Sequence, residues 1–153
     1  MNIVIIGYLY SGEVELANFL EKKYFCSTLY LDEILPKSDA TNEIKCKMVK
    51  EFMKENISWV IEGTYEDILL EERIEKADKI VIMKYNRFSC LFRYIRRQRK
   101  NKEKINKEDI KEIFINNRKS KYRKLFNNIM RKYSDRVVLI FNNAQNFMLK
   151  DMI

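Results

Sequence analysis

The feature that most constrains the fold is a short apolar run followed by two glycines at a fixed spacing. Residues Ile3–Ile6 predict a buried strand, and Gly7 to Val14 follow the frame G-x-x-x-x-G-K-[S/T], which joins a strand to a helix. In that geometry, backbone N–H groups and a helix N-terminus surround a phosphate. The last two places of the frame, however, hold Glu13 and Val14. This stretch therefore predicts the shape of a phosphate site, with a carboxylate where the site needs a lysine.

The glycine spacing also has a purely structural interpretation. A carboxylate such as Glu13 in the first turn of a helix is stabilised by the helix macrodipole. The two glycines would then mark an ordinary strand-to-helix turn. Taken by themselves, these residues leave both interpretations open.

Apolar runs and helical patterns alternate along the chain. The runs are rich in Ile, Val and Leu without polar alternation, which is typical of strands buried on both faces of a parallel sheet. They are Ile3–Ile6, Thr28–Leu31, Trp59–Ile61, Ile80–Met83 and Val137–Phe141. Between them lie two amphipathic patterns and one short charged segment: 13–24 with Leu16, Phe19 and Leu20 facing the core, 43–56 with Ile44, Met48, Phe52 and, as a further candidate, Met53, and 67–76. This alternation predicts a doubly wound α/β domain.

The second half of the chain is strongly basic. Residues 86–136 hold 18 Lys and Arg against 5 Asp and Glu, a net charge of +13 within a total of +8. Apolar residues at helical spacing predict a first helix whose core face is Phe88, Leu91, Phe92 and Ile95. After a lysine-rich stretch at 101–109, a second helix is expected between Ile110 and Met130. Such a basic region is either a solvated face or the binding face for an anion: nucleotide phosphates, nucleic acid or an acidic protein surface.

Composition excludes several chemistries. The 153 residues are the size of one domain and include no histidine, so imidazole cannot serve as acid, base or ligand. Three widely spaced cysteines without C-x-x-C pairing predict reduced thiols, and we expect neither zinc nor haem. No apolar run is long enough for a membrane span or a signal core. We therefore expect a cytoplasmic protein without a membrane partner.

Two acids follow predicted strands. In "SWVIEGTYED" a strand ends in Glu62 and continues through Gly63 to Tyr65, and in "TLYLDEIL" Asp32 follows another strand. Acids at the carboxyl ends of parallel strands lie where ligands bind, and in phosphoryl transfer such an acid holds Mg²⁺ directly or through water. The alternatives are an exposed acid that caps a turn at Glu62 and a helix N-cap at Asp32.

In this order, the motifs resemble one family over nearly the whole chain. The most specific stretches are W-[VI]-I-[DE]-G-x-Y, from Trp59 to Tyr65, and the run "ADKIVIMKYNRFSCLFRYIRR" from Ala77 to Arg97. They resemble the DNA topology modulation protein family, which belongs to the adenylate-kinase-like P-loop kinases. The resemblance implies a single α/β P-loop NTPase domain over residues 1–153. Its five-stranded parallel sheet would be flanked by helices, with an arginine-rich helical lid at about residues 93–124.

The resemblance also implies roles for individual residues. Those that match nucleotide-binding positions are Gly7, Ser11, Gly12, Glu13, Val14, Arg93 and Arg97. Those on the substrate side are Asp32, Gly63 and Tyr65, and Glu62 would hold the metal if Mg²⁺ is bound. The chain departs from the family where Glu13 and Val14 replace a lysine and a hydroxyl, where Lys84 replaces an acid, and where Asn86 replaces a proline.

These departures lie at the catalytic centre. The candidate catalytic residues are therefore Glu62, Lys84 and Arg97, and we hypothesise an ion pair between Glu13 and Lys84. ATP and Mg²⁺ are implied by the resemblance, but the charge at Glu13 opposes them. We expect a degenerate kinase-like protein that binds a nucleotide or another phosphate-bearing small molecule, with little or no phosphoryl transfer.

Two alternatives remain at this stage. In the first, the chain is an active nucleotide or small-molecule kinase that uses Lys84 in place of the missing lysine. In the second, it binds nucleic acid through residues 86–136. The spacing of Phe88, Phe92 and Tyr94 favours a core face over a platform for base stacking.

Overall fold

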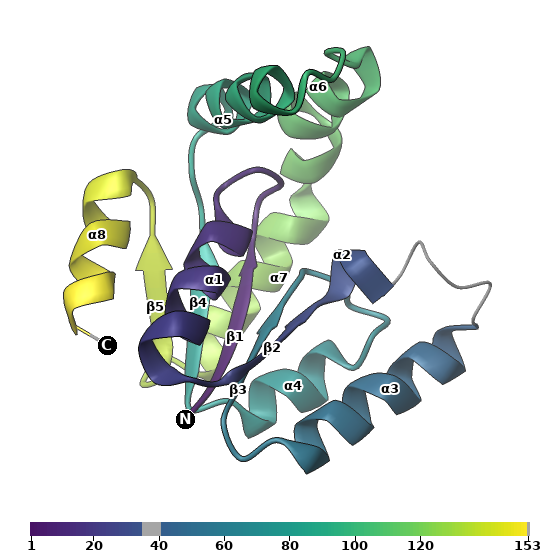
Figure 1. Cartoon of the computed structure of the whole chain (residues 1–153), viewed down its shortest axis with the longest axis vertical. Coiled ribbons are helices and arrows are strands. Elements are labelled where there is room, and N and C mark those ends of the chain that lie inside the picture. Colours follow the sequence, from purple (N-terminus) through teal and green to yellow (C-terminus); the bar gives the residue numbers. More distant parts are fainter. Residues whose placement is uncertain (35–40, 153) are drawn as a thin grey trace. The chain divides into compact units, whose positions relative to one another are not determined.

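The computed structural model describes residues 1–34 and 41–152. Their five strands form one sheet in the order β2-β3-β1-β4-β5 (Figure 1). The chain divides into two compact units: residues 1–6 with 13–81 (unit 1), and residues 7–12 with 82–153 (unit 2). The predicted five-stranded parallel sheet flanked by helices is confirmed. None of the described helices is long and apolar enough to cross a membrane.

Unit 1 carries three neighbouring strands of the sheet. Its elements are β1 (Asn2–Gly7), α1 (Glu13–Tyr24), β2 (Ser27–Tyr30), α2 (Leu31–Ile34), α3 (Asn42–Glu55), β3 (Trp59–Glu62) and α4 (Leu70–Lys76). β3 pairs in parallel with β1 on one side and with β2 on the other, so that Val60 lies opposite Ile3 and Thr28. Ile3–Ile6 are at most 1% exposed, as expected for a strand covered on both faces.

The predicted core face of α3 is correct at Met53 but wrong at Ile44 and Met48. The structure buries Val49 and Met53, whereas Ile44 and Met48 are 50% and 43% exposed. The buried pair lies one residue further along the sequence, which is a rotation of about 100° around the helix axis. Apolar residues cover more than one stripe of this helix, so the periodicity alone did not select the packed face.

Unit 2 contains most of the basic half of the chain. Its elements are the end of β4 (Lys79–Met83), α5 (Arg87–Asn101), α6 (Lys107–Phe114), the 3₁₀ turn η1 (Asn116–Arg118), α7 (Ser120–Lys132), β5 (Val137–Ile140) and α8 (Asn143–Met152). The second long helix predicted between Ile110 and Met130 is therefore three separate elements. α6 ends at Phe114, and Lys119 adopts extended backbone angles between η1 and α7. α8 was not predicted.

The predicted core face of α5 is also wrong. The buried residues are Cys90, Tyr94 and Gln98, while Phe88 and Phe92 are 74% and 68% exposed. The buried side chains have partners for their polar atoms: the Tyr94 hydroxyl accepts a hydrogen bond from the backbone N–H of residue 106 at 2.7 Å, and the Gln98 amide donates to the carbonyl of residue 104 at 3.0 Å. Burial of these polar residues turns the aromatic stripe of α5 towards solvent.

Candidate functional site

The turn between Gly7 and Gly12 belongs to unit 2, and its own contacts define its shape. The N–H of Tyr8 donates to the carbonyl at the end of β4 at 3.1 Å, and the N–H of Leu9 donates to the Asn117 side chain at 2.6 Å. The N–H of Ser11 donates to the Tyr8 carbonyl at 3.0 Å, and its hydroxyl donates to the end of β4 at 3.2 Å. Three N–H groups of the predicted phosphate cradle, and the hydroxyl of Ser11, are thus already bonded to protein acceptors.

α5 brings a positive charge to this turn. Gly12 has a φ of +101°, and a Cβ added there would lie 2.6 Å from Nη1 of Arg93. The guanidinium also donates from Nη2 to Oδ1 of Asn143 at 2.6 Å and lies 5.0 Å from the centroid of the Tyr85 ring. The structure therefore brings together two predicted site residues, Gly12 and Arg93. Arg97 lies one helical turn further along α5 and is exposed.

Lys84, a candidate catalytic residue, directly follows β4. Its backbone N–H donates to the carbonyl of Ile140 at 2.7 Å, and its Nζ lies 5.9 Å from the centroid of the Phe141 ring. The proposed partner, Glu13, belongs to unit 1. The Glu13–Lys84 ion pair would join the two units, and it stays a prediction.

Unit 1 contains a buried carboxyl at the end of β3. Glu62 is 6% exposed and Glu13, at the start of α1, is 9% exposed. Burial, together with the negative charges of Glu13 and Asp32, raises the pKa of Glu62 to about 8, and the guanidinium of Arg73 opposes this shift. Its Oε2 has no hydrogen-bond partner among the described residues. With this pKa, the protonated form of Glu62 predominates at neutral pH.

The predicted substrate-side residues lie together in unit 1. Asp32 is in the short helix α2, where its Oδ1 accepts a hydrogen bond from the Tyr65 hydroxyl. Gly63 has a φ of +132°, and a Cβ there would lie 2.9 Å from the Cβ of Leu31. Its N–H donates to the carbonyl of Ile5 at 3.0 Å, which continues the pairing of β3 with β1. Only glycine fits this position without strain.

Arg73 holds this loop in place, although no sequence motif predicts this role. The side chain is fully buried and donates to the carbonyls of Ile68, Gly63 and Tyr65 at 2.9, 3.0 and 2.8 Å. Burial lowers its pKa to about 10, against the opposing effect of Glu62. Nothing in the charged segment "EERIEK" marks this arginine as different from its neighbours.

Two of the residues expected near a metal are poor ligands for Mg²⁺. Val14 has no oxygen to offer a metal, and Glu62 holds a proton at neutral pH. Across residues 1–34 and 41–152, no three His, Cys, Asp or Glu side chains lie close enough together to hold a metal ion. Mg²⁺ at kinase sites usually keeps several waters and is bound through one or two carboxylates and the substrate phosphates, so a metal here would depend on Glu62 losing its proton.

Comparison with solved structures agrees with the fold. A shikimate kinase from Acinetobacter baumannii, solved in complex with shikimate, aligns over 99% of this chain and 89% of its own, with a TM-score of 0.63 and 15% identity. An uncharacterized protein from Eubacterium ventriosum ATCC 27560 aligns over 99% and 95%, with a TM-score of 0.59 and 17% identity. No family model and no curated protein sequence matches the chain. The chain has the fold of the P-loop kinases.

Proposed function

We propose that this chain binds a phosphate-bearing anion, such as a nucleotide, beside the Gly7–Gly12 turn, with little or no phosphoryl transfer. In this proposal it is a degenerate relative of the DNA topology modulation proteins. The observation that carries the proposal is the contact between the Arg93 guanidinium and Gly12. A guanidinium is always charged and binds phosphate oxygens through two parallel N–H bonds. Arg93 thus supplies the positive charge that residue 13 does not.

The charge at position 13 opposes catalysis. Two unit charges about 4 Å apart interact by about 4 kcal/mol at an effective dielectric of about 20. A change from lysine to Glu13 turns an attraction of that size into a repulsion. Since each 1.36 kcal/mol is a factor of about ten in rate, the loss amounts to several powers of ten.

The state of the turn and of Glu62 supports the same conclusion. The N–H groups of Tyr8, Leu9 and Ser11 are bonded within the protein, so the backbone has fewer donors for a triphosphate. The carboxyl of Glu62 is neutral at pH 7 and is a poor metal ligand in that form. The anion would therefore be held by side chains, without a metal.

Calorimetric titration with pyrophosphate and with ATP, each with Mg²⁺ and with EDTA, tests this proposal. We expect binding that does not require the metal and no ADP in a coupled assay. Arg93→Gln should weaken binding tenfold or more, because a charged hydrogen-bonding partner is lost. The control Arg96→Gln removes an exposed arginine of the same helix and should have little effect.

The same titration decides between this proposal and the kinase that uses Lys84. Metal-dependent binding of ATP with ADP production that Lys84→Gln abolishes would establish the kinase. If neither pyrophosphate nor ATP binds, both the metal-free anion site and the Lys84 kinase are ruled out.

A further inference from the structure

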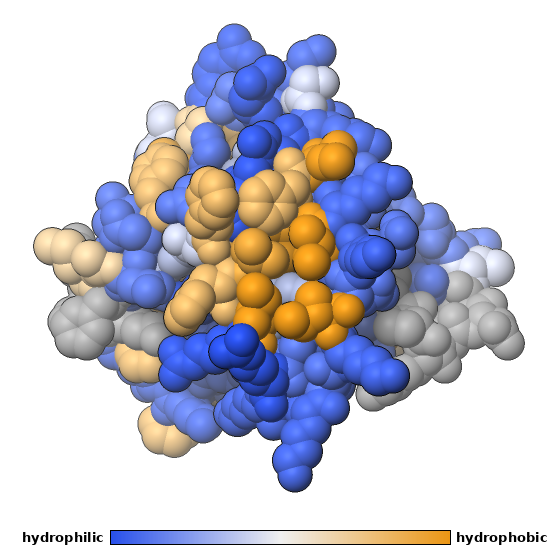
Figure 2. Space-filling view, turned by 90° about the horizontal axis from the view of Figure 1, so that it is seen from above, coloured by the Kyte–Doolittle hydropathy of each residue, from blue (hydrophilic) through white to orange (hydrophobic). Residues whose placement is uncertain are grey.

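The exposed aromatic rings of α5 have no role in the site described above. Phe88 and Phe92 are 74% and 68% exposed, and Ile115, after α6, is 57% exposed. Figure 2 looks onto the end of unit 2 that carries α5 and α6, and shows hydrophobic residues gathered within a hydrophilic surround. The ring of Phe88 is supported by Phe114, edge to face, with centroids 5.7 Å apart. Two phenylalanine rings four residues apart on a basic helix are thus presented to solvent.

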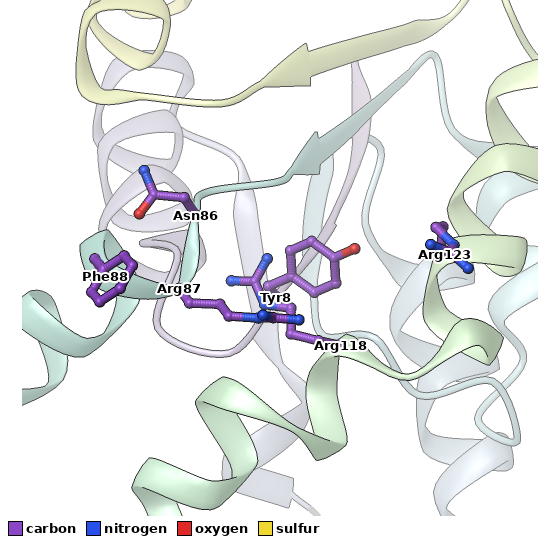
Figure 3. A pocket seen from close by; sticks show the side chains of 6 residues that line it. All are labelled: Tyr8, Asn86, Arg87, Phe88, Arg118 and Arg123. Atoms are coloured by element: carbon purple, nitrogen blue, oxygen red, sulfur yellow. The ribbon is translucent and has the colours of Figure 1, made fainter.

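A basic pocket opens beside Phe88. Its volume is about 410 Å³, and it is lined by Tyr8, Asn86, Arg87, Phe88, Arg118 and Arg123 (Figure 3). Arg118 stacks on Tyr8, with its guanidinium carbon 3.7 Å from the ring centroid. It also donates from Nη2 to the carbonyl of Tyr85 at 2.7 Å, so its position is fixed by the protein.

The positive charge in this pocket is not neutralised by the described part of the chain. Within residues 1–34 and 41–152, none of Arg87, Arg118 and Arg123 forms an ion pair with an acid. The Nε of Arg118 is buried and has no hydrogen-bond partner there. Burial lowers the pKa of Arg118, and the nearby charge of Arg87 lowers it further. Guanidinium groups that line one pocket without a counter-charge attract an anion.

We propose that this face of unit 2 binds single-stranded nucleic acid. Phosphates would lie in the pocket of Arg87, Arg118 and Arg123, and bases would stack on Phe88 and Phe92. A positive groove combined with exposed aromatic rings is how sequence-tolerant single-strand binding is built. Residues four apart rise about 6 Å along a helix, which leaves room for a base on each ring.

The observations favour a strand over a single nucleotide. Two separate rings are exposed, although one base needs only one of them. The net charge of +13 extends over residues 86–136, well beyond the three arginines of the pocket. The proposal uses neither Arg93 nor Gly12, so it stands or fails separately from the function proposed above.

Fluorescence anisotropy of a labelled oligothymidylate of about 12 nucleotides tests the proposal with the full chain. We expect saturable binding that weakens as salt increases. Phe88→Ala and Phe92→Ala should each weaken it on the order of tenfold, through lost stacking. Arg123→Gln should reduce the slope of log affinity against log salt by about 0.7, the value for one phosphate contact.

Matched controls come from unit 1. Phe25 is 94% exposed and Lys54 is exposed, so Phe25→Ala and Lys54→Gln remove one ring and one charge elsewhere. Both should leave the affinity unchanged. Circular dichroism should show all five variants folded, because each replaced side chain is exposed.

Three results would overturn the proposal. The first is no binding of the oligonucleotide at low salt. The second is equal loss in the control variants, which would mean general attraction to a basic protein. The third is competition by thymidine monophosphate as effective, per nucleotide, as by the unlabelled strand, which would make the pocket a site for single nucleotides.

Discussion

Replacing Glu62 by glutamine should make the protein more stable at alkaline pH. Glu62 is buried at the end of β3, and burial, together with the charges of Glu13 and Asp32, raises its pKa to about 8. Glutamine has nearly the same shape as the protonated acid and cannot ionise. The variant therefore keeps the packing of the native state and removes the cost of ionising a buried carboxyl.

The size of the effect follows from the two pKa values. The folded-state pKa is about 8, against 4.5 for a free side chain, a difference of about 3.5 units. At 1.36 kcal/mol per unit, this corresponds to about 5 kcal/mol. Between these two pH values the folded protein holds a proton that the unfolded chain has lost, so wild-type stability falls as the pH rises through this range. Below about pH 4.5 this destabilisation is absent, and above about pH 8 it has its full value.

Urea denaturation near pH 5 and near pH 8.5 measures this difference. At the lower pH, wild type and Glu62→Gln should differ by about 1 kcal/mol or less, because pH 5 is only about half a unit above the pKa of the carboxyl in the unfolded chain. At the higher pH, the variant should be more stable by several kcal/mol. Glu55→Gln, at the exposed end of α3, should follow the wild type at both pH values.

The reasoning is refuted if wild type and Glu62→Gln show the same change of unfolding free energy with pH. That result would mean that Glu62 is ionised in the folded protein at neutral pH. The metal-free character of the proposed site would then lose one of its supports.

Three further predictions concern Glu13 and Arg73 in unit 1 and Gly12 in unit 2. Glu13→Gln should lower the pKa of Glu62 by removing a neighbouring negative charge, and the pH-dependent loss of stability should then end at a lower pH. Arg73→Leu should destabilise the fold by at least about 3 kcal/mol in urea, because three carbonyl groups lose a charged donor. Gly12→Ala should weaken pyrophosphate binding on calorimetry by about tenfold, because its Cβ would displace the Arg93 guanidinium and its φ is positive.

Each of these has a contrary outcome. An unchanged dependence of stability on pH in Glu13→Gln would mean that the charge of Glu13 does not affect the pKa of Glu62. A loss below about 1 kcal/mol in Arg73→Leu would mean that water replaces the guanidinium. Unchanged pyrophosphate affinity in Gly12→Ala would mean that anion binding does not depend on the contact between Arg93 and Gly12.

Much of the fold could be predicted because its signals are local. Unbroken apolar runs predicted β1, β3 and β4 nearly to their ends, and the glycine spacing predicted the turn before α1. Alternation of strands and helices predicted the parallel sheet. These features depend on the chemistry of a few consecutive residues, which the sequence displays directly.

The faces of the helices were less predictable. α3 and α5 carry apolar residues around more than one stripe, and the packed stripe depends on what each helix meets. In α5 the residues buried are Tyr94 and Gln98, because α6 and the preceding loop supply partners for their polar atoms. Phe88 and Phe92 are consequently exposed, and this exposure is the basis of the proposed nucleic-acid site.

By itself, the sequence determined which residue types occupy the predicted site positions: an acid at position 13, an acid at the end of β3 and arginines on α5. Only the tertiary structure decided the ionisation state and the contacts of these groups. Glu62 is mainly protonated because it is buried and because acids from α1 and α2 lie near it. The Arg93 guanidinium lies at Gly12 because the fold brings α5 next to the turn. Ionisation and contact depend on groups far apart in the chain, and folding brings those groups together.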